Sequence, residues 1–165
     1  MPFLFLSDNV WKVKSSSVTF RIKNAGIAVD GSFTGLESDI KFNPLKPAEA
    51  SITASVKTAT INTGTAMRDN HLRKEEYLDA EKYPKIILKS EKIEKTGPIS
   101  YKGIFKLSLK NITKEVTIPF TFSKLPDRTE FKGSFKLNRR DYNVGGSSIT
   151  MSDDADVSIL INVTE

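Results

Sequence analysis

The chain contains 165 residues, and its 25 basic and 20 acidic side chains give a formal net charge of +5 at pH 7. This length favours one domain with a single core. The absence of cysteine excludes disulfides and thiolate metal sites, and no apolar run is long enough to span a membrane.

The N-terminal segment carries a short apolar stretch at residues 3–6. It is too short for the hydrophobic region of a signal peptide, and no basic segment precedes it. We expect residues 1–10 to form an N-terminal arm or an extra strand of one domain that covers residues 1–165. The protein is then cytoplasmic if Met1 is the native start, unless a leader has been removed.

Alternation of apolar and polar residues dominates the rest of the chain. Apolar side chains recur at every second position, which is the period of a strand with one buried face. The pattern predicts about eight strands, at residues 18–23, 31–42, 51–57, 86–89, 102–110, 116–122, 130–137 and 157–163. Lysines occupy many alternate positions, which is typical of the solvated face of a sheet. We therefore expect no nucleic-acid partner.

Turn-forming segments rich in Pro, Gly, Asn and Asp separate these strands, so consecutive strands should pair antiparallel. One apolar face per strand must be buried, and the sequence offers no set of helices to cover it. A sandwich or a closed barrel remains, and about eight strands suit a barrel that holds one small ligand or is filled by side chains. Pro119 lacks a backbone donor, which predicts a bulge or a locally unpaired position.

Only residues 65–78 favour a helix. Met67, Leu72 and Tyr77 give this segment a loosely amphipathic pattern, and Pro84 prevents its continuation. We expect a short helical connection that lies over one opening of the barrel, with Met67, Leu72 or Tyr77 facing inward.

His71 is the only histidine, which excludes a two-histidine zinc site made by this chain alone. It is also the single candidate base for a serine–histidine–aspartate arrangement. We favour a structural role, in which a hydrogen bond from the imidazole holds the helical connection, because Arg68 and Asp69 make a local ion-pair network easy. We therefore predict no catalytic residues and no metal.

Two other charged clusters have alternative interpretations. The acidic run at residues 153–156 lacks the glycine and the final glutamate of an EF-hand loop, so a solvated turn before the last strand is favoured over a calcium site. The tripeptide Arg139-Arg140-Asp141 offers charges for an anion, but an ion pair at a strand end is the favoured interpretation.

The polar patch between residues 62 and 90 resembles the signature of the YceI-like family. Its elements occur in the family's order, as Asn62-Thr63-Gly64, Arg68-Asp69-Asn70-His71-Leu72, Lys82-Tyr83-Pro84 and Lys89-Ser90. Segments at residues 31–36, 112–117 and 137–145 also resemble family motifs, so the resemblance extends from about Trp11 to the C-terminus. Lys14-Ser15 and Asn143 depart from the family pattern.

This resemblance implies an extended, lipocalin-like antiparallel barrel around an apolar tunnel. Such barrels bind polyisoprenoid or isoprenoid-quinone chains, so the implied partner is a long-chain apolar lipid, with no other cofactor. The resemblance also implies a periplasmic or secreted location, and we leave a homodimer open.

The candidate ligand contacts are apolar side chains on the inferred inward face and in the helical segment. They are Phe20, Ile22, Phe33, Phe42, Ile52, Ala54, Val56, Met67, Leu72, Tyr77, Ile86, Leu88, Phe105, Leu107, Phe120 and Phe135. Periodicity alone does not distinguish a hollow barrel from a solid one, and the family resemblance favours the hollow one. The alternative is a solid barrel that serves as a structural, protein-interaction or stress-response module. An enzyme is least favoured, because no inward pair of base and nucleophile can be named.

Overall fold

The computed structural model describes residues 9–165. The strands are β1 (Val10–Asn24), β2 (Ile27–Phe33), β3 (Glu37–Lys41), β4 (Ser51–Lys57), β5 (Lys85–Lys95), β6 (Ser100–Leu109), β7 (Ile112–Lys124), β8 (Thr129–Asn138) and β9 (Met151–Thr164). One helix, α1 (Ala66–Leu72), and short 3₁₀ segments at Pro47–Glu49, Thr58–Thr60 and Arg139–Tyr142 complete the elements. Most of the predicted arm at residues 1–10 lies outside the described residues, and Val10 begins β1.

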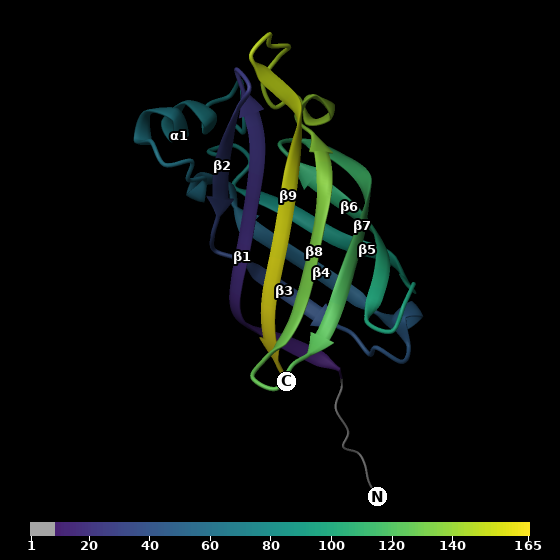
Figure 1. The fold of residues 1–165 in the computed structure, drawn as a ribbon. Coiled ribbons are helices and arrows are strands. Elements are labelled where there is room, and N and C mark those ends of the chain that lie inside the picture. Colours follow the sequence, from purple (N-terminus) through teal and green to yellow (C-terminus); the bar gives the residue numbers. More distant parts are fainter. Residues whose placement is uncertain (1–8) are drawn as a thin grey trace, which may run out of the picture.

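Closure of the sheet follows from the two edges of β1. One edge pairs with β9 along most of the strand, and the other pairs with β3 at Val10 and Trp11. Strands β3 to β9 pair in consecutive order, and β1 joins β9 to β3, so these eight strands form a closed ring (Figure 1). Every pairing in the ring is antiparallel. The ninth strand, β2, continues the wall beside residues 18–24 of β1. The predicted antiparallel barrel of about eight strands is confirmed.

Two predicted boundaries were wrong. The expected strand at residues 31–42 is divided into β2 and β3, because Gly35 adopts a left-handed conformation with φ +72° that ends the extended chain. The acidic run at residues 153–156 belongs to β9 rather than to a turn before it. Its three aspartates are exposed, and Asp156 forms an ion pair of 3.2 Å with Lys136 on β8.

Pro119 lies within β7, opposite Lys102 of β6 in an uninterrupted register. The ladder between β7 and β8 contains only residues 120–124 of β7, so it stops next to Pro119. The missing N–H of proline therefore falls where β7 has no ladder partner on that side, in agreement with the predicted unpaired position.

The helical connection is shorter than predicted. Helix α1 ends at Leu72, and the chain then turns back, with the Leu78 N–H donating to the Leu72 carbonyl at 3.0 Å. This turn brings Leu78 and Ala80 into the core, which a continuous helix to residue 78 would not do. In Figure 1, α1 lies beside β2 near one end of the barrel.

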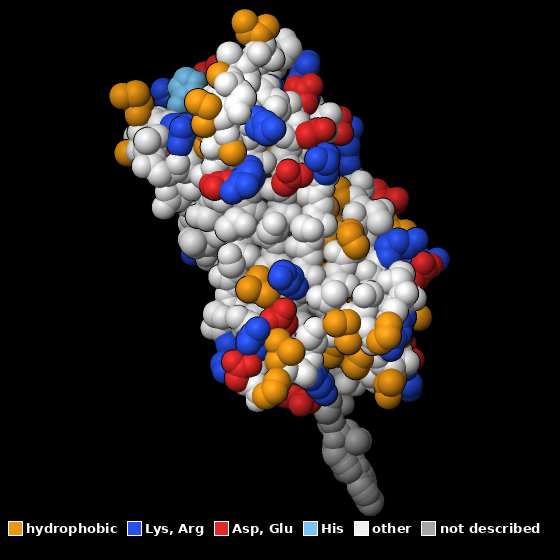
Figure 2. All heavy atoms as spheres, viewed as in Figure 1, with side chains coloured by type: hydrophobic (Ala, Val, Ile, Leu, Met, Phe, Trp, Pro, Cys, Tyr) orange, Lys and Arg blue, Asp and Glu red, His pale blue; other side chains and the backbone are white. Residues whose placement is uncertain are grey.

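The surface carries intermixed charge. Basic and acidic side chains alternate over the face shown in Figure 2, without one large patch of either sign. Exposed ion pairs, such as Arg21 with Asp30 at 2.6 Å, connect neighbouring strands. Among residues 9–165, no helix combines the length and apolar character needed to cross a membrane.

Candidate functional site

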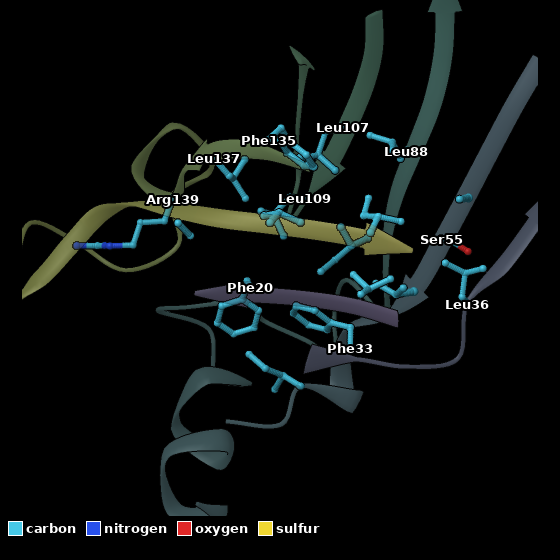
Figure 3. Close-up of a pocket in the computed structure, with 18 of the residues that line it drawn as sticks. Phe20, Phe33, Leu36, Ser55, Leu88, Leu107, Leu109, Phe135, Leu137 and Arg139 are labelled. Carbon is cyan, nitrogen blue, oxygen red and sulfur yellow. The ribbon is translucent and has the colours of Figure 1, made fainter. Parts of the chain in front are cut away.

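The interior of the barrel contains a cavity of about 280 Å³ that every strand helps to line. Its surface is almost wholly apolar, and Figure 3 shows aliphatic and phenyl side chains from separate strands directed into a common space. The volume lies near the lower end of the range for small-molecule pockets, roughly 300–1,000 Å³. It is also nearly twice that of an apolar cavity of roughly 150 Å³ that binds benzene. The site therefore suits an apolar guest.

Small residues on the inward face keep this part of the barrel hollow. Ala54 and Ala155 place methyl groups where larger side chains would fill the space. Gly31 has a different role, because a Cβ atom there would lie 2.1 Å from the ring of its neighbour Phe20. The absence of that atom lets the Phe20 ring lie across Gly31 on the cavity wall.

One end of the barrel is solid. Six aromatic side chains, which we call the aromatic floor, fill this end: Trp11, Phe42, Tyr101, Phe120, Phe122 and Phe131. The Phe42 side chain is 0% exposed, and its ring centroid lies 5.1 Å from that of Tyr101 and 5.0 Å from that of Phe122. These spacings are typical of packed aromatic pairs. The interior is therefore a cavity above a floor, rather than the implied tunnel.

Most of the predicted contact residues line the cavity. They are Phe20, Ile22, Phe33, Ile52, Ala54, Val56, Leu72, Tyr77, Ile86, Leu88, Phe105, Leu107, Phe120 and Phe135. The strands bring these side chains together because successive side chains of a strand point to opposite faces of the sheet, and the barrel has one inside. Their contact with a ligand stays a prediction.

Two predicted residues lie elsewhere. Phe42 is buried in the aromatic floor and does not line the cavity. Met67 is 85% exposed, although we expected it to face inward. Met67 and Leu72 are five positions apart, so at 3.6 residues per turn they lie about 140° apart around the helix. Because Leu72 faces the cavity, Met67 must point outward.

Arg139 is a buried member of the cavity wall that sequence analysis did not identify as such. Its guanidinium donates to the backbone carbonyls of Ser152 (2.9 Å), Val144 (2.9 Å), Gly146 (2.8 Å) and Met151 (3.3 Å). It also pairs with Asp153 at 3.5 Å. This agrees with the favoured interpretation of an ion pair at a strand end. Every residue has a backbone carbonyl, so the sequence does not show which carbonyls accept hydrogen bonds from Arg139, and no sequence pattern indicated this role.

A second polar cluster holds the start of α1 against the preceding segment. The buried Asp69 carboxylate accepts hydrogen bonds from the Thr63 N–H at 2.8 Å and the Thr63 hydroxyl at 2.6 Å. The Arg68 Nε donates to the same hydroxyl at 2.7 Å. Arg68 and Asp69, two residues of the family signature, therefore hydrogen-bond to a third, Thr63, and fix the conformation of this part of the cavity wall.

His71 lies outside this cluster on the exposed side of the helix. Its ring contacts that of Tyr77 at a centroid distance of 5.2 Å, and within residues 9–165 no hydrogen bond from the imidazole is found, so the predicted bond stays without support. Within residues 9–165, no group of three or more His, Asp or Glu side chains is placed to hold a metal ion.

Burial shifts the pKa values of the two most buried tyrosines, Tyr101 and Tyr142. Burial raises the pKa of the Tyr101 hydroxyl above its usual 10.0. Burial, with a smaller contribution from the charge of Asp141, raises the pKa of Tyr142 in the same direction. Both phenols are therefore neutral at physiological pH, and neither is among the residues that line the cavity.

Comparison with known proteins places this chain among bacterial proteins of similar length. The model of the YceI-like domain matches residues 11–163. A UPF0312 protein of Pseudomonas savastanoi pv. phaseolicola is 31% identical over 149 residues, which are 86% of this chain and 78% of that protein. A UPF0312 protein of Photorhabdus laumondii is 30% identical over 151 residues, covering 87% and 78% of the two chains.

Solved structures show the same fold. BcnA of Burkholderia cenocepacia superposes with a TM-score of 0.85 at 24% identity, covering 91% of this chain and 96% of that one. The YceI protein of Campylobacter jejuni gives 0.71 at 28% identity, covering 83% and 86%. A polyisoprenoid-binding domain of Saccharophagus degradans gives 0.73 at 11% identity, covering 93% and 96%. The match over residues 11–163 and these relatives show that the chain belongs to the YceI-like family.

Proposed function

We propose that this protein binds the chain of an isoprenoid lipid, either a polyisoprenoid or an isoprenoid quinone, and sequesters or carries it without chemical change. The observation that carries the proposal is the apolar cavity inside the barrel, lined from every strand. Each methylene-sized group that leaves water gains about 0.8 kcal/mol, so such a lining binds a chain with few polar contacts. The structural neighbour from Saccharophagus degradans, described as a polyisoprenoid-binding domain, supports the same choice of ligand.

The polar groups of the cavity wall support binding rather than catalysis. Arg139 is engaged with backbone carbonyls, and Arg68 and Asp69 are engaged with Thr63. These contacts hold the fold, and they occupy the groups that would otherwise act on a substrate. The non-enzymatic role is therefore part of the proposal, and the hollow interior argues against the solid-barrel alternative.

The test compares two neighbouring residues of β5 that face opposite sides of the wall. Leu88 lines the cavity, whereas Ile87 points outward and is partly exposed. Wild type, Leu88→Asp and Ile87→Asp are purified, extracted with organic solvent and analysed by mass spectrometry. A charge facing a dry apolar cavity is costly, so Leu88→Asp should lose the lipid while Ile87→Asp retains it.

Circular dichroism establishes that each variant is folded before the lipid contents are compared. A wild type that yields no isoprenoid chain contradicts the proposal, as does an equal lipid content in the two variants. The periplasmic or secreted location and the homodimer stay predictions, which cell fractionation and light scattering would test.

A further inference from the structure

The aromatic floor separates the cavity from the solid end of the barrel. Of its six side chains, only Phe120 and Phe131 also line the cavity. Behind them, the Phe42 centroid lies 5.2 Å from that of Phe131 and 6.2 Å from that of Phe120. The Phe122 and Phe131 centroids are 4.8 Å apart. A chain that enters the cavity therefore meets a packed aromatic layer with no room to continue.

The depth of the cavity above this floor follows from the strand that carries Phe131. On β8, the lining residues run from Phe131 to Leu137. This span covers about 20 Å of strand at ~3.3 Å per residue. Barrel strands tilt by roughly 40°, so the depth along the barrel axis is about 15 Å. That is half of the ~30 Å hydrocarbon core of a bilayer, which two lipid chains span end to end. The cavity is therefore about as deep as one ordinary lipid chain is long.

We infer that the aromatic floor limits the length of chain that this protein buries, and that Phe120 and Phe131 are the residues that set this limit. The inference rests on the proposed function and adds a chain-length specificity to it. Chains that end at the floor bury all of their apolar surface. A longer polyisoprenoid buries only one end, and the rest emerges at the opposite end of the lining, beside Asn24, Val144 and Met151.

The wild-type protein provides the first test. Ligand-free protein is titrated with geraniol, farnesol, geranylgeraniol and solanesol, which add isoprene units in that order, and binding is followed by displacement of a fluorescent prenyl probe. While the added five-carbon unit is still buried, affinity should rise by up to about a thousandfold per unit. Once the chain reaches the floor, affinity should level off, so solanesol should bind no more tightly than the alcohol that first fills the cavity.

Variants on β8 then locate the limit. Phe131→Ala removes a ring from the floor, so the length at which affinity levels off should increase by about one isoprene unit. Phe135→Ala is the matched control, because Phe135 lies on the same face of β8 but on the side wall of the cavity. It should change affinity for all four alcohols without moving the length limit. Phe131→Leu, a smaller change, serves if Phe131→Ala does not fold.

The outcomes separate this inference from the function on which it rests. Affinity that continues to rise through solanesol in the wild type overturns the length limit and leaves lipid binding intact. Folded Phe131→Ala and Phe131→Leu proteins with an unmoved limit overturn the role of Phe131. If none of the four alcohols binds, the proposed function fails, and the length limit fails with it.

Discussion

At the scale of single residues, the charged side chains of the cavity wall organise the backbone. Arg139 is 5% exposed and gathers four backbone carbonyls around the segment that leads into β9. Buried carbonyls without a partner are costly, and the guanidinium offers five donors in a fixed planar geometry that can satisfy several of them. Arg139, which the sequence offered as part of a candidate anion site, thus anchors the backbone.

Substitution of this anchor has a defined cost. Arg139→Ala should lower the free energy of unfolding by about 3 kcal/mol or more, because several buried carbonyls lose their donor at once. Arg140→Ala, at the exposed neighbouring position, should change it by only about 0.5 kcal/mol. Chemical denaturation of both variants measures the difference. Equal stabilities would show that the hydrogen bonds of Arg139 do not hold this end of the barrel.

His71 should be replaceable. It is exposed, and the contact with the Tyr77 ring is the only one found for its side chain among the described residues. His71→Ala should therefore change stability by no more than about 0.5 kcal/mol, as for most surface substitutions. The lipid content of the purified protein should not change. Elemental analysis provides a further check. Zinc that copurifies in stoichiometric amount with the wild type and is lost from the variant would contradict the structural role of His71.

At the scale of elements, α1 and the turn after it complete the cavity wall beside β2. Leu72, Tyr77 and the buried Leu78 line the cavity from this segment. The helix has seven residues, which is too short to be stable alone. Its attachment to the barrel depends on the hydrogen bonds between Asp69 and Thr63 and on the packing of Leu72 against the core.

A charge on the inner side of α1 should disturb binding. Leu72→Asp places a carboxylate against the apolar cavity, which is costly in a dry site. The variant should exchange a bound prenyl chain faster than the wild type, or lose it. Met67→Asp is the control, since it adds the same charge to the outer side of the same helix. Stopped-flow exchange of a fluorescent prenyl probe measures the exchange rate of each variant. Equal rates for Leu72→Asp and Met67→Asp would contradict a role of this segment in retaining the ligand.

At the scale of the whole molecule, one barrel is divided into a hollow part and a solid part. Side chains on the cavity wall, such as Phe33 and Phe135, retain partial exposure because they face empty space. Those at the other end, such as Trp11 and Tyr101, are packed on all sides. The solid part supplies the close packing that stabilises the fold, so the hollow part need not be filled for the barrel to form.

This division predicts the effect of a large side chain in the hollow part. Ala54 lies opposite Leu88 on the inner wall, and Ala54→Trp should place its indole in the cavity. The loss of stability should stay below the roughly 1–3 kcal/mol typical of overpacking a filled core. The lipid content should fall sharply. Thr53→Trp, the neighbouring outward position on β4, should leave the lipid content unchanged.

Thermal unfolding and lipid extraction together decide the outcome for Ala54→Trp. A variant that does not fold, beside a wild type that yields no lipid, would favour a solid barrel. A folded variant with undiminished lipid content would place the ligand elsewhere.

The sequence by itself determined the strands and the residues that face inward. Successive side chains of a strand alternate between its two faces whatever the strand pairs with, so Phe20, Leu107 and Phe135 could be assigned to the inside from local pattern alone. The number of strands and the shortage of helices then favoured a closed barrel. Where local geometry interrupts the pattern, as at Gly35 or after Leu72, the predicted boundaries were wrong.

Only the tertiary structure decided which inward positions surround a cavity and which fill the core. Phe42 and Phe135 have the same character in the sequence, yet one lies in the aromatic floor and the other on the cavity wall. The difference depends on which side chains meet across the barrel. Phe42 meets Phe131, 89 positions later in the chain, because closure of β1 against β3 and β9 sets the stagger of the strands. Local periodicity carries no information about that stagger, and therefore none about the depth of the cavity.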